Sequence, residues 1–172
     1  MRNITLRTAF WVSLVLAGAS LAALALIDET LKGPHVPLGI VSYELCAYTA
    51  NCADMIASWQ GSTQAMAAMS LGLDYLFMVA YPALICFGLL ICKTALPSGL
   101  RGVATFLAAA IWLAGLADAI ENYHLFQMLA GQAIDQHAWP ASVAATIKFV
   151  VLVPALLLWL GSGVKYLLSH RQ

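Results

Sequence analysis

The sequence predicts an all-α integral membrane protein built as a bundle of four transmembrane helices. Of its 172 residues, 62% are hydrophobic and 9% are charged, whereas about 25% of the residues of a typical soluble domain are charged. Four apolar runs are long enough to cross the ~30 Å hydrocarbon layer, which takes about 20 helical residues. Only helices and closed barrels satisfy the backbone in lipid, and these runs lack the alternation of barrel strands.

The spans are expected at about 8–27, 66–92, 102–125 and 141–168. Arg2 and Arg7 precede the first run, as basic residues precede a secretion signal. Its apolar core is longer than the ~7–15 residues of such a signal, however. We therefore expect a true first span and a single membrane domain covering residues 1–172.

The segment between the first two spans predicts one further helix. A turn-forming stretch, "GPHVPLG", is followed by residues 40–59, where apolar side chains recur at steps of three and four. We expect an amphipathic helix that lies at the outer face or folds back on the bundle. An ordinary interfacial helix without chemistry stays open as an alternative.

The orientation follows from the basic residues of the short connections. Lys93 and Arg101 flank the loop between spans two and three, and Lys165 and Arg171 follow span four. Lys32 is the one basic residue in the other two loops of the sequence. Both termini and the middle loop are therefore predicted to face the cytoplasm, in a multi-pass protein.

Ionisable residues collect at one depth near the outer side. At ~1.5 Å of rise per residue, Asp28, Asp74, Asp118 and Lys148 each lie roughly 25–31 Å from the cytoplasmic end of their own span. An acid at the centre of a spanning helix costs about 2.5–3.5 kcal/mol, so such groups usually face a protein interior or a cavity. The spacing predicts that Lys148 pairs with Asp118 and is shared with Asp74.

This layer predicts a polar pocket open to the outer side. Asp118, Glu121 and Asn122 share one side of span three because they are three and four residues apart. A buried acid–lysine pair that merely fixes helix register is the competing interpretation. The candidate ligand-binding residues are Asp74, Asp118, Glu121, Asn122, Lys148 and Glu44.

The four cysteines are predicted to be packing residues. Cys46 and Cys52 lie six residues apart, which on one continuous helix means ~9 Å of rise and is too far for a disulfide. Cys86 and Cys92 have the same spacing in the other half of the bundle. No Cys-x-x-Cys motif of a thiol oxidoreductase is present.

Metal and aspartyl chemistry are each weakly supported by the sequence. Glu121 and His124 form one Glu-x-x-His motif, but a di-iron site needs a second, although His35 and His137 could approach from the outer connections. We expect no metal and no cofactor. Asp74 and Asp118 could share a proton as a hydrolytic dyad, but the asparagine and arginine motifs of lipoprotein signal peptidases are missing.

Two resemblances extend these interpretations. The segments "GIVSYELC", "LGLDYLFMVAYP" and "LADAIENYH" resemble those of an uncharacterised group of small bacterial four-span proteins, which implies a bacterial inner membrane. The layout of Asp28, Asp74 with Pro82, and Pro154 resembles the EXPERA domain of sterol isomerases and sigma-2 receptors. That resemblance implies an apolar cavity with acids at its mouth, where sterol-like amines bind. Lys148 departs from the pattern.

Three functions follow as hypotheses. The first is a protein that binds a lipid or other amphiphilic small molecule in the outer pocket. The second is an enzyme acting on a lipid-like substrate there, either an EXPERA-like isomerase or an aspartyl hydrolase. The third is a structural or accessory subunit, and a homo-oligomer or a membrane complex stays open. Eight basic and eight acidic residues argue against nucleic-acid binding, which needs a basic face.

Overall fold

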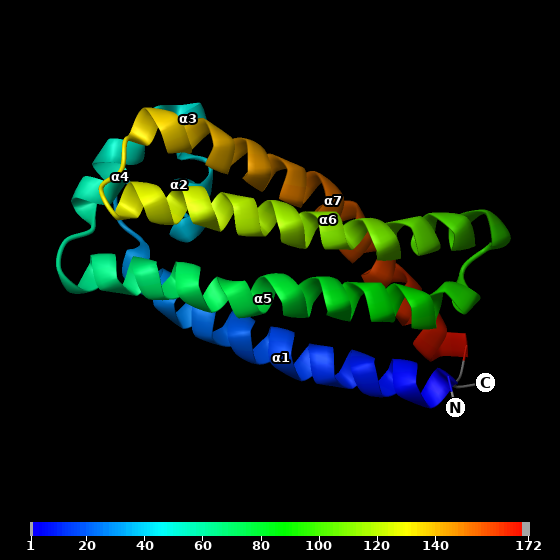
Figure 1. Cartoon of the computed structure of the whole chain (residues 1–172). Helices are drawn as coiled ribbons and strands as arrows, with labels where there is room; N and C mark the ends of the chain where they lie inside the picture. Colours follow the sequence, from blue (N-terminus) through cyan, green and yellow to red (C-terminus); the bar gives the residue numbers. More distant parts are fainter. Residues whose placement is uncertain (1, 170–172) are drawn as a thin grey trace.

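The computed structural model describes the backbone of residues 2–169 and the side chains of residues 5–168. Four long helices dominate this part of the chain (Figure 1): α1 (Arg2–Leu31), α5 (Ser62–Cys92), α6 (Ser98–Leu129) and α7 (Ile134–Ser169). The chain between α1 and α5 forms α2 (Ile40–Glu44), α3 (Cys46–Thr49) and α4 (Cys52–Ser58). A short 3-10 turn, η1 (Lys93–Ala95), leads from α5 towards α6.

The predicted fold class is confirmed. The described chain is 88% helical and contains no strand. Four of its helical segments are long and apolar enough to cross a membrane: Thr5–Leu31, Ser62–Ala95, Ser98–Leu129 and Ile134–Leu168. They extend past the expected spans, because a helix continues into the polar turns that flank its apolar core.

The four long helices pack as neighbours in chain order, and α1 and α7 diverge along their length. Helix α1 lies along α5, while α5, α6 and α7 pack on one another. Near the chain termini α1 meets α7, where Arg7 Nη2 donates to Tyr166 Oη at 3.2 Å and the rings of Phe10 and Trp159 lie 6.2 Å apart. We call this the terminal end, and the end that carries α2–α4 the capped end (Figure 1).

Close packing between α5 and α6 depends on small residues, as is common for membrane helices. A Cβ atom on Gly115 would lie only 2.6 Å from the backbone oxygen of Met78, so a larger residue would separate the two helices. Ala104, Ala108 and Ala114 are buried on the same helix. The alanines and glycine of this span therefore set the helix–helix distance.

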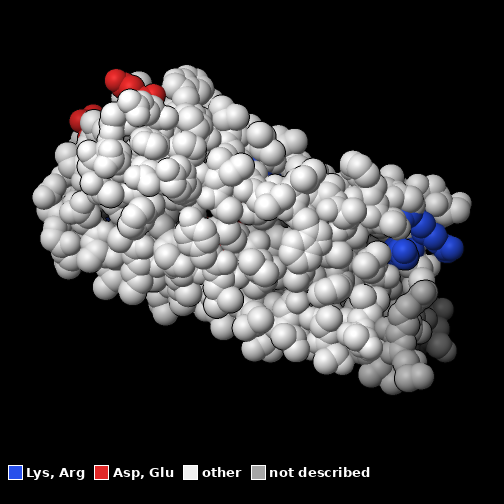
Figure 2. Space-filling model, viewed as in Figure 1, with Lys and Arg blue, Asp and Glu red and all other residues white. Residues whose placement is uncertain are grey.

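The charged side chains visible on one face gather at the two ends of the molecule. Figure 2 shows acidic groups towards the capped end, basic groups towards the terminal end and, apart from a trace of blue, an uncharged surface between them. Among the basic residues, Lys93 and Arg101 lie at the terminal end, whereas Arg171 falls outside the described residues. An uncharged middle zone is what a spanning protein presents to lipid.

The helix expected over residues 40–59 is divided into the short helices α2, α3 and α4. Leu45 separates α2 from α3. Ala50, between α3 and α4, adopts the left-handed conformation with φ 51°. The segment folds back on the bundle: Tyr43 is fully buried and donates its hydroxyl to the backbone oxygen of Leu125 at 2.9 Å. Trp59 Nε1 donates to the backbone oxygen of Leu31 at 2.9 Å.

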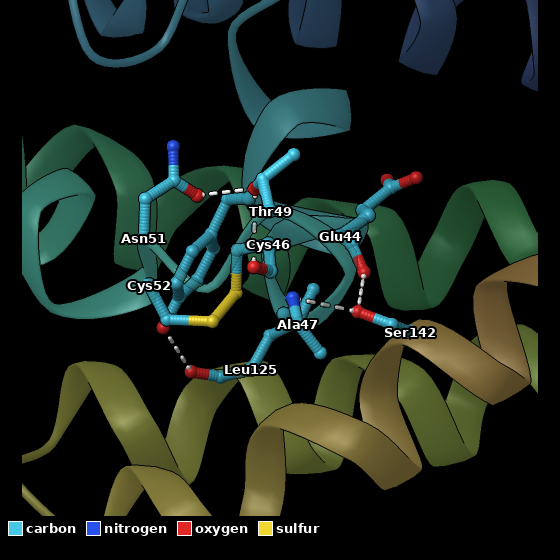
Figure 3. The surroundings of a disulfide bond; sticks show 9 residues. Glu44, Cys46, Ala47, Thr49, Asn51, Cys52, Leu125 and Ser142 are labelled. Carbon is cyan, nitrogen blue, oxygen red and sulfur yellow. Dashed lines mark hydrogen bonds between the residues drawn. A yellow bond between two sulfur atoms is a disulfide. The ribbon is translucent and has the colours of Figure 1, made fainter.

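The prediction that Cys46 and Cys52 only fill space is wrong, because they form a disulfide (Figure 3). The turn at Ala50 reverses the chain and brings their Cα atoms to 4.9 Å, well inside the range a disulfide requires. The sequence estimate failed because it assumed one continuous helix. Cys86 and Cys92 are free and buried, as expected for packing cysteines.

Alkylation of the denatured protein should therefore modify two cysteines without reductant and all four after reduction, as counted by intact mass. Replacing Cys46 and Cys52 together by serine should lower the free energy of unfolding by about 2 kcal/mol, since the bond closes a short loop. Cys86→Ser serves as the matched control. Four reactive thiols in the unreduced protein would show that the bond is absent.

Candidate functional site

The centre of the site is the ammonium group of Lys148 on α7. Its Nζ atom lies 3.1 Å from Asp118 Oδ1, 2.8 Å from Glu121 Oε2 and 3.3 Å from Glu44 Oε2. All four residues are buried. One cation thus holds three carboxyl groups that come from two separate helices, α2 and α6.

The local sequence explains why these carboxyl groups converge. Asp118 and Glu121 lie one helical turn apart, so both face α7 from the same side of α6. Glu44 is the last residue of α2. Its backbone oxygen accepts a hydrogen bond from Ser142 Oγ of α7 at 2.7 Å (Figure 3), which fixes Glu44 beside Lys148.

The start of α2 is held by α1. The backbone N–H of Ile40 donates to Asp28 Oδ1 at 2.6 Å. Gly39, just before, has φ +58°, and a Cβ atom there would collide with the Asp28 carboxyl group. Only glycine meets both requirements at this position. Asp28 therefore anchors the cap instead of joining the Lys148 cluster.

Asp74 belongs to a second polar pair. Asn122 Nδ2 donates to Asp74 Oδ2 at 2.7 Å and to the backbone oxygen of Leu71 at 3.3 Å. Among the described residues, the carboxyl groups within ion-pair distance of Lys148 are those of Glu44, Asp118 and Glu121. The expected sharing of Lys148 with Asp74 is therefore not a direct contact, although both side chains line one cavity.

That cavity, of about 390 Å³, lies between α1, α2, α5, α6 and α7. Its polar lining comes from Asp28, Glu44, Ser70, Asp74, Tyr81, Asp118, Asn122 and Lys148. Its apolar lining comes from Leu21, Leu24, Ala25, Ile40, Val41, Leu71, Phe77, Phe149 and Leu152. Glu121 lies behind Lys148 and outside the lining. The volume falls within the ~300–1,000 Å³ of small-molecule sites.

Two buried polar atoms of the cavity lining are incompletely hydrogen-bonded among the described residues. They are the hydroxyl of Tyr81, which interacts with the Asp118 carboxyl group, and Oε2 of Glu44, which lies 3.3 Å from Lys148 Nζ. Both atoms lie on the cavity wall.

The charges of the site do not balance. Three carboxyl groups, those of Glu44, Asp118 and Glu121, contact one ammonium group, and a fourth, that of Asp74, lines the same cavity. Burial raises the pKa of the Glu44 carboxyl group in the cap, and Lys148 opposes that effect. The cluster therefore holds more carboxyl groups than one cation can neutralise, and burial favours the neutral form of the Glu44 carboxyl group.

Of the six predicted site residues, Glu44, Asp74, Asp118, Asn122 and Lys148 line the cavity, and Glu121 contacts Lys148 from outside that lining. Sequence reasoning missed Tyr81, Ser142 and the disulfide. Tyr81 could have been found, since it lies seven residues after Asp74 and hence on the same face of α5. Ser142 and the disulfide gave no such signal, because their roles depend on how the cap folds.

Two of the histidines, His124 and His137, form a separate pair at the capped end. Nδ1 of His124 lies 2.8 Å from Nδ1 of His137, at hydrogen-bond distance. Within the described residues, no group of three or more His, Cys, Asp or Glu side chains is placed to hold a metal ion.

Comparison of the chain with protein-family models, curated proteins and solved structures gives no match. The function must therefore be argued from the site.

Removing the Lys148 ammonium group should lower the stability of the folded protein more than removing any one of its carboxyl partners. Lys148→Met leaves three buried carboxyl groups without a counter-charge, and we expect a loss of about 3–5 kcal/mol in stability. Adding Asp118→Asn to Lys148→Met should recover part of this loss. Thermal unfolding in detergent measures the effect. If the stability losses of Lys148→Met and Asp118→Asn simply added in the double variant, the coupling between the two residues would be contradicted.

Glu44 should give stability a definite pH dependence. Because its pKa is raised in the folded protein, the folded state holds this proton more tightly than the unfolded state. Ionisation of Glu44 must then destabilise the fold as the pH rises above the unfolded pKa of about 4.3. The melting temperature of wild type relative to Glu44→Gln should therefore fall between acidic and neutral pH. A wild-type melting temperature that rises relative to that of Glu44→Gln as the pH increases would refute this.

Proposed function

We propose that the protein binds an amphiphilic small molecule or lipid in the cavity at its capped end. The observation that carries the proposal is the mixed lining of the cavity. Carboxyl, amide, hydroxyl and ammonium groups of α1, α2, α5, α6 and α7 line it together with aliphatic and aromatic side chains of α1, α2, α5 and α7. Such a lining matches a molecule with a polar head and an apolar body.

The polar groups beyond the Lys148 ion pairs favour binding over a purely structural role. A cluster that only locked the helices would be complete once Lys148 had met its three carboxyl partners. Tyr81 and Asp74 are additional to that lock and lie on the cavity wall. A polar head that both donates and accepts hydrogen bonds would satisfy them.

We propose further that the capped end faces the outside of a bacterial cytoplasmic membrane, with both chain termini inside. Arg7, Lys93, Arg101 and Lys165 lie on segments at the terminal end, which is the distribution that cytoplasmic loops favour. The Cys46–Cys52 disulfide in the cap agrees, because disulfides persist in oxidising compartments. The bacterial assignment rests on the resemblance to bacterial four-span proteins.

Binding can be tested with a matched pair of cavity variants. Ala25 lines the cavity, whereas Ala22, three residues earlier on α1, is exposed and outside the lining. Ala25→Phe should weaken binding by about tenfold, equivalent to about 1.4 kcal/mol, and Ala22→Phe should leave it unchanged. Native mass spectrometry of the purified protein, alone and titrated with oleic acid, oleylamine or oleyl alcohol, measures occupancy. The three probes share one tail and differ in their heads.

The polar end can be tested with Asp74→Asn. This residue lies outside the Lys148 ion pairs, and the amide retains the size of the side chain, so the melting temperature should change little. Affinity for the preferred probe should fall, since the head loses a charged partner. A wild type that carries no molecule from its membrane and takes up none of the three probes would overturn the proposed function.

A further inference from the structure

The cavity is closed on the side that would meet water. Helix α2 lies across its capped end, contributing Ile40, Val41 and Glu44 to the lining. Several hydrogen bonds fasten this cap to the bundle: Ile40 to Asp28 of α1, Tyr43 to Leu125 of α6, and Ser142 of α7 to Glu44. The disulfide links α3 to α4 and restrains the same segment.

The cavity is also closed towards the terminal end. Ala17 of α1 and Ala80 and Leu84 of α5 form a buried cluster, with Phe10 and Trp159 packed against it. Trp159 belongs to α7, so α1, α5 and α7 are joined at this level. Any passage into the cavity must therefore lie between this cluster and the capped end.

The remaining side is the gap between α1 and α7. The two helices approach at the terminal end and separate towards the cap (Figure 1). The apolar lining residues on these two helices are Leu21, Leu24 and Ala25 on α1 and Phe149 and Leu152 on α7. Leu21 is 54% exposed, whereas Leu71 on the inner wall is 2% exposed. The open side of the cavity is therefore apolar and lies within the spanning part of both helices.

We propose that the cavity is loaded sideways from the membrane, through the gap between the capped halves of α1 and α7. The ligand is then a lipid-dissolved amphiphile, with its head among Asp74, Tyr81 and Lys148 and its tail directed between the two helices. About 390 Å³ is near the lower end of small-molecule sites, so the cavity holds one chain or one ring system. This inference rests on the proposed function and adds the phase from which the ligand comes.

Spin labelling tests the route without requiring a known ligand. In a Cys86→Ala, Cys92→Ala background that keeps the disulfide, a nitroxide is attached at Leu24→Cys, in the cavity lining. Ala22→Cys provides the lipid-facing control. Glu29→Cys, near the end of α1, provides the water-facing control. The protein is reconstituted in lipid nanodiscs, and collisions with oxygen, which dissolves in lipid, are compared with collisions with a water-soluble nickel chelate.

We expect the label at position 24 to collide with oxygen and not with nickel, as at position 22 and unlike position 29. Adding the best-bound oleyl probe should lower the oxygen collisions at 24 and leave those at 22 unchanged. Strong nickel collisions at 24, or none with either reagent, would overturn the lateral route. Probe binding together with nickel access would leave the proposed function standing, whereas oxygen access without binding of any probe would reject the function alone.

Discussion

The ammonium group of Lys148 is the interaction on which the rest of the structure depends. Its partners Asp118 and Glu121 join α6 to α7, and its partner Glu44 draws the cap onto the same point. Each of these carboxyl groups would be costly in the apolar interior if left unpaired. Because one cation serves three acids from two helices, the cap and the spanning bundle form one cooperative unit.

The cavity follows from this arrangement. Lys148 and its partners hold α6, α7 and the cap together, and α1 packs mainly on α5. The capped half of α1 is therefore separated from α7, and the cavity in this half is lined by polar groups of the cluster and by aliphatic and aromatic residues. A guest that satisfies Tyr81 and the excess carboxyl groups would complete the bundle.

Sequence reasoning reached the spans and the proximity of Asp118 to Lys148, because hydropathy and the rise per helical residue fix depth and face without knowledge of packing. It assigned Asp118 to Lys148 correctly for that reason. It failed in the cap, where a left-handed Ala50 breaks the helix and creates the Cys46–Cys52 disulfide. Helical periodicity continues through such a break in the sequence, so the pattern alone does not reveal it. The gap beside α1 depends on helix crossing, which the sequence does not encode locally.

The central claim is that the cavity between α1, α5 and α7 holds a molecule from the membrane. The most direct measurement is a density map of the protein in lipid nanodiscs, prepared without added ligand. The account predicts elongated non-protein density that touches Asp74 and Tyr81 and reaches the lipid between α1 and α7. A cavity that contains only water, or that has closed because Phe149 and Leu152 pack directly on Leu21 and Leu24, would contradict it.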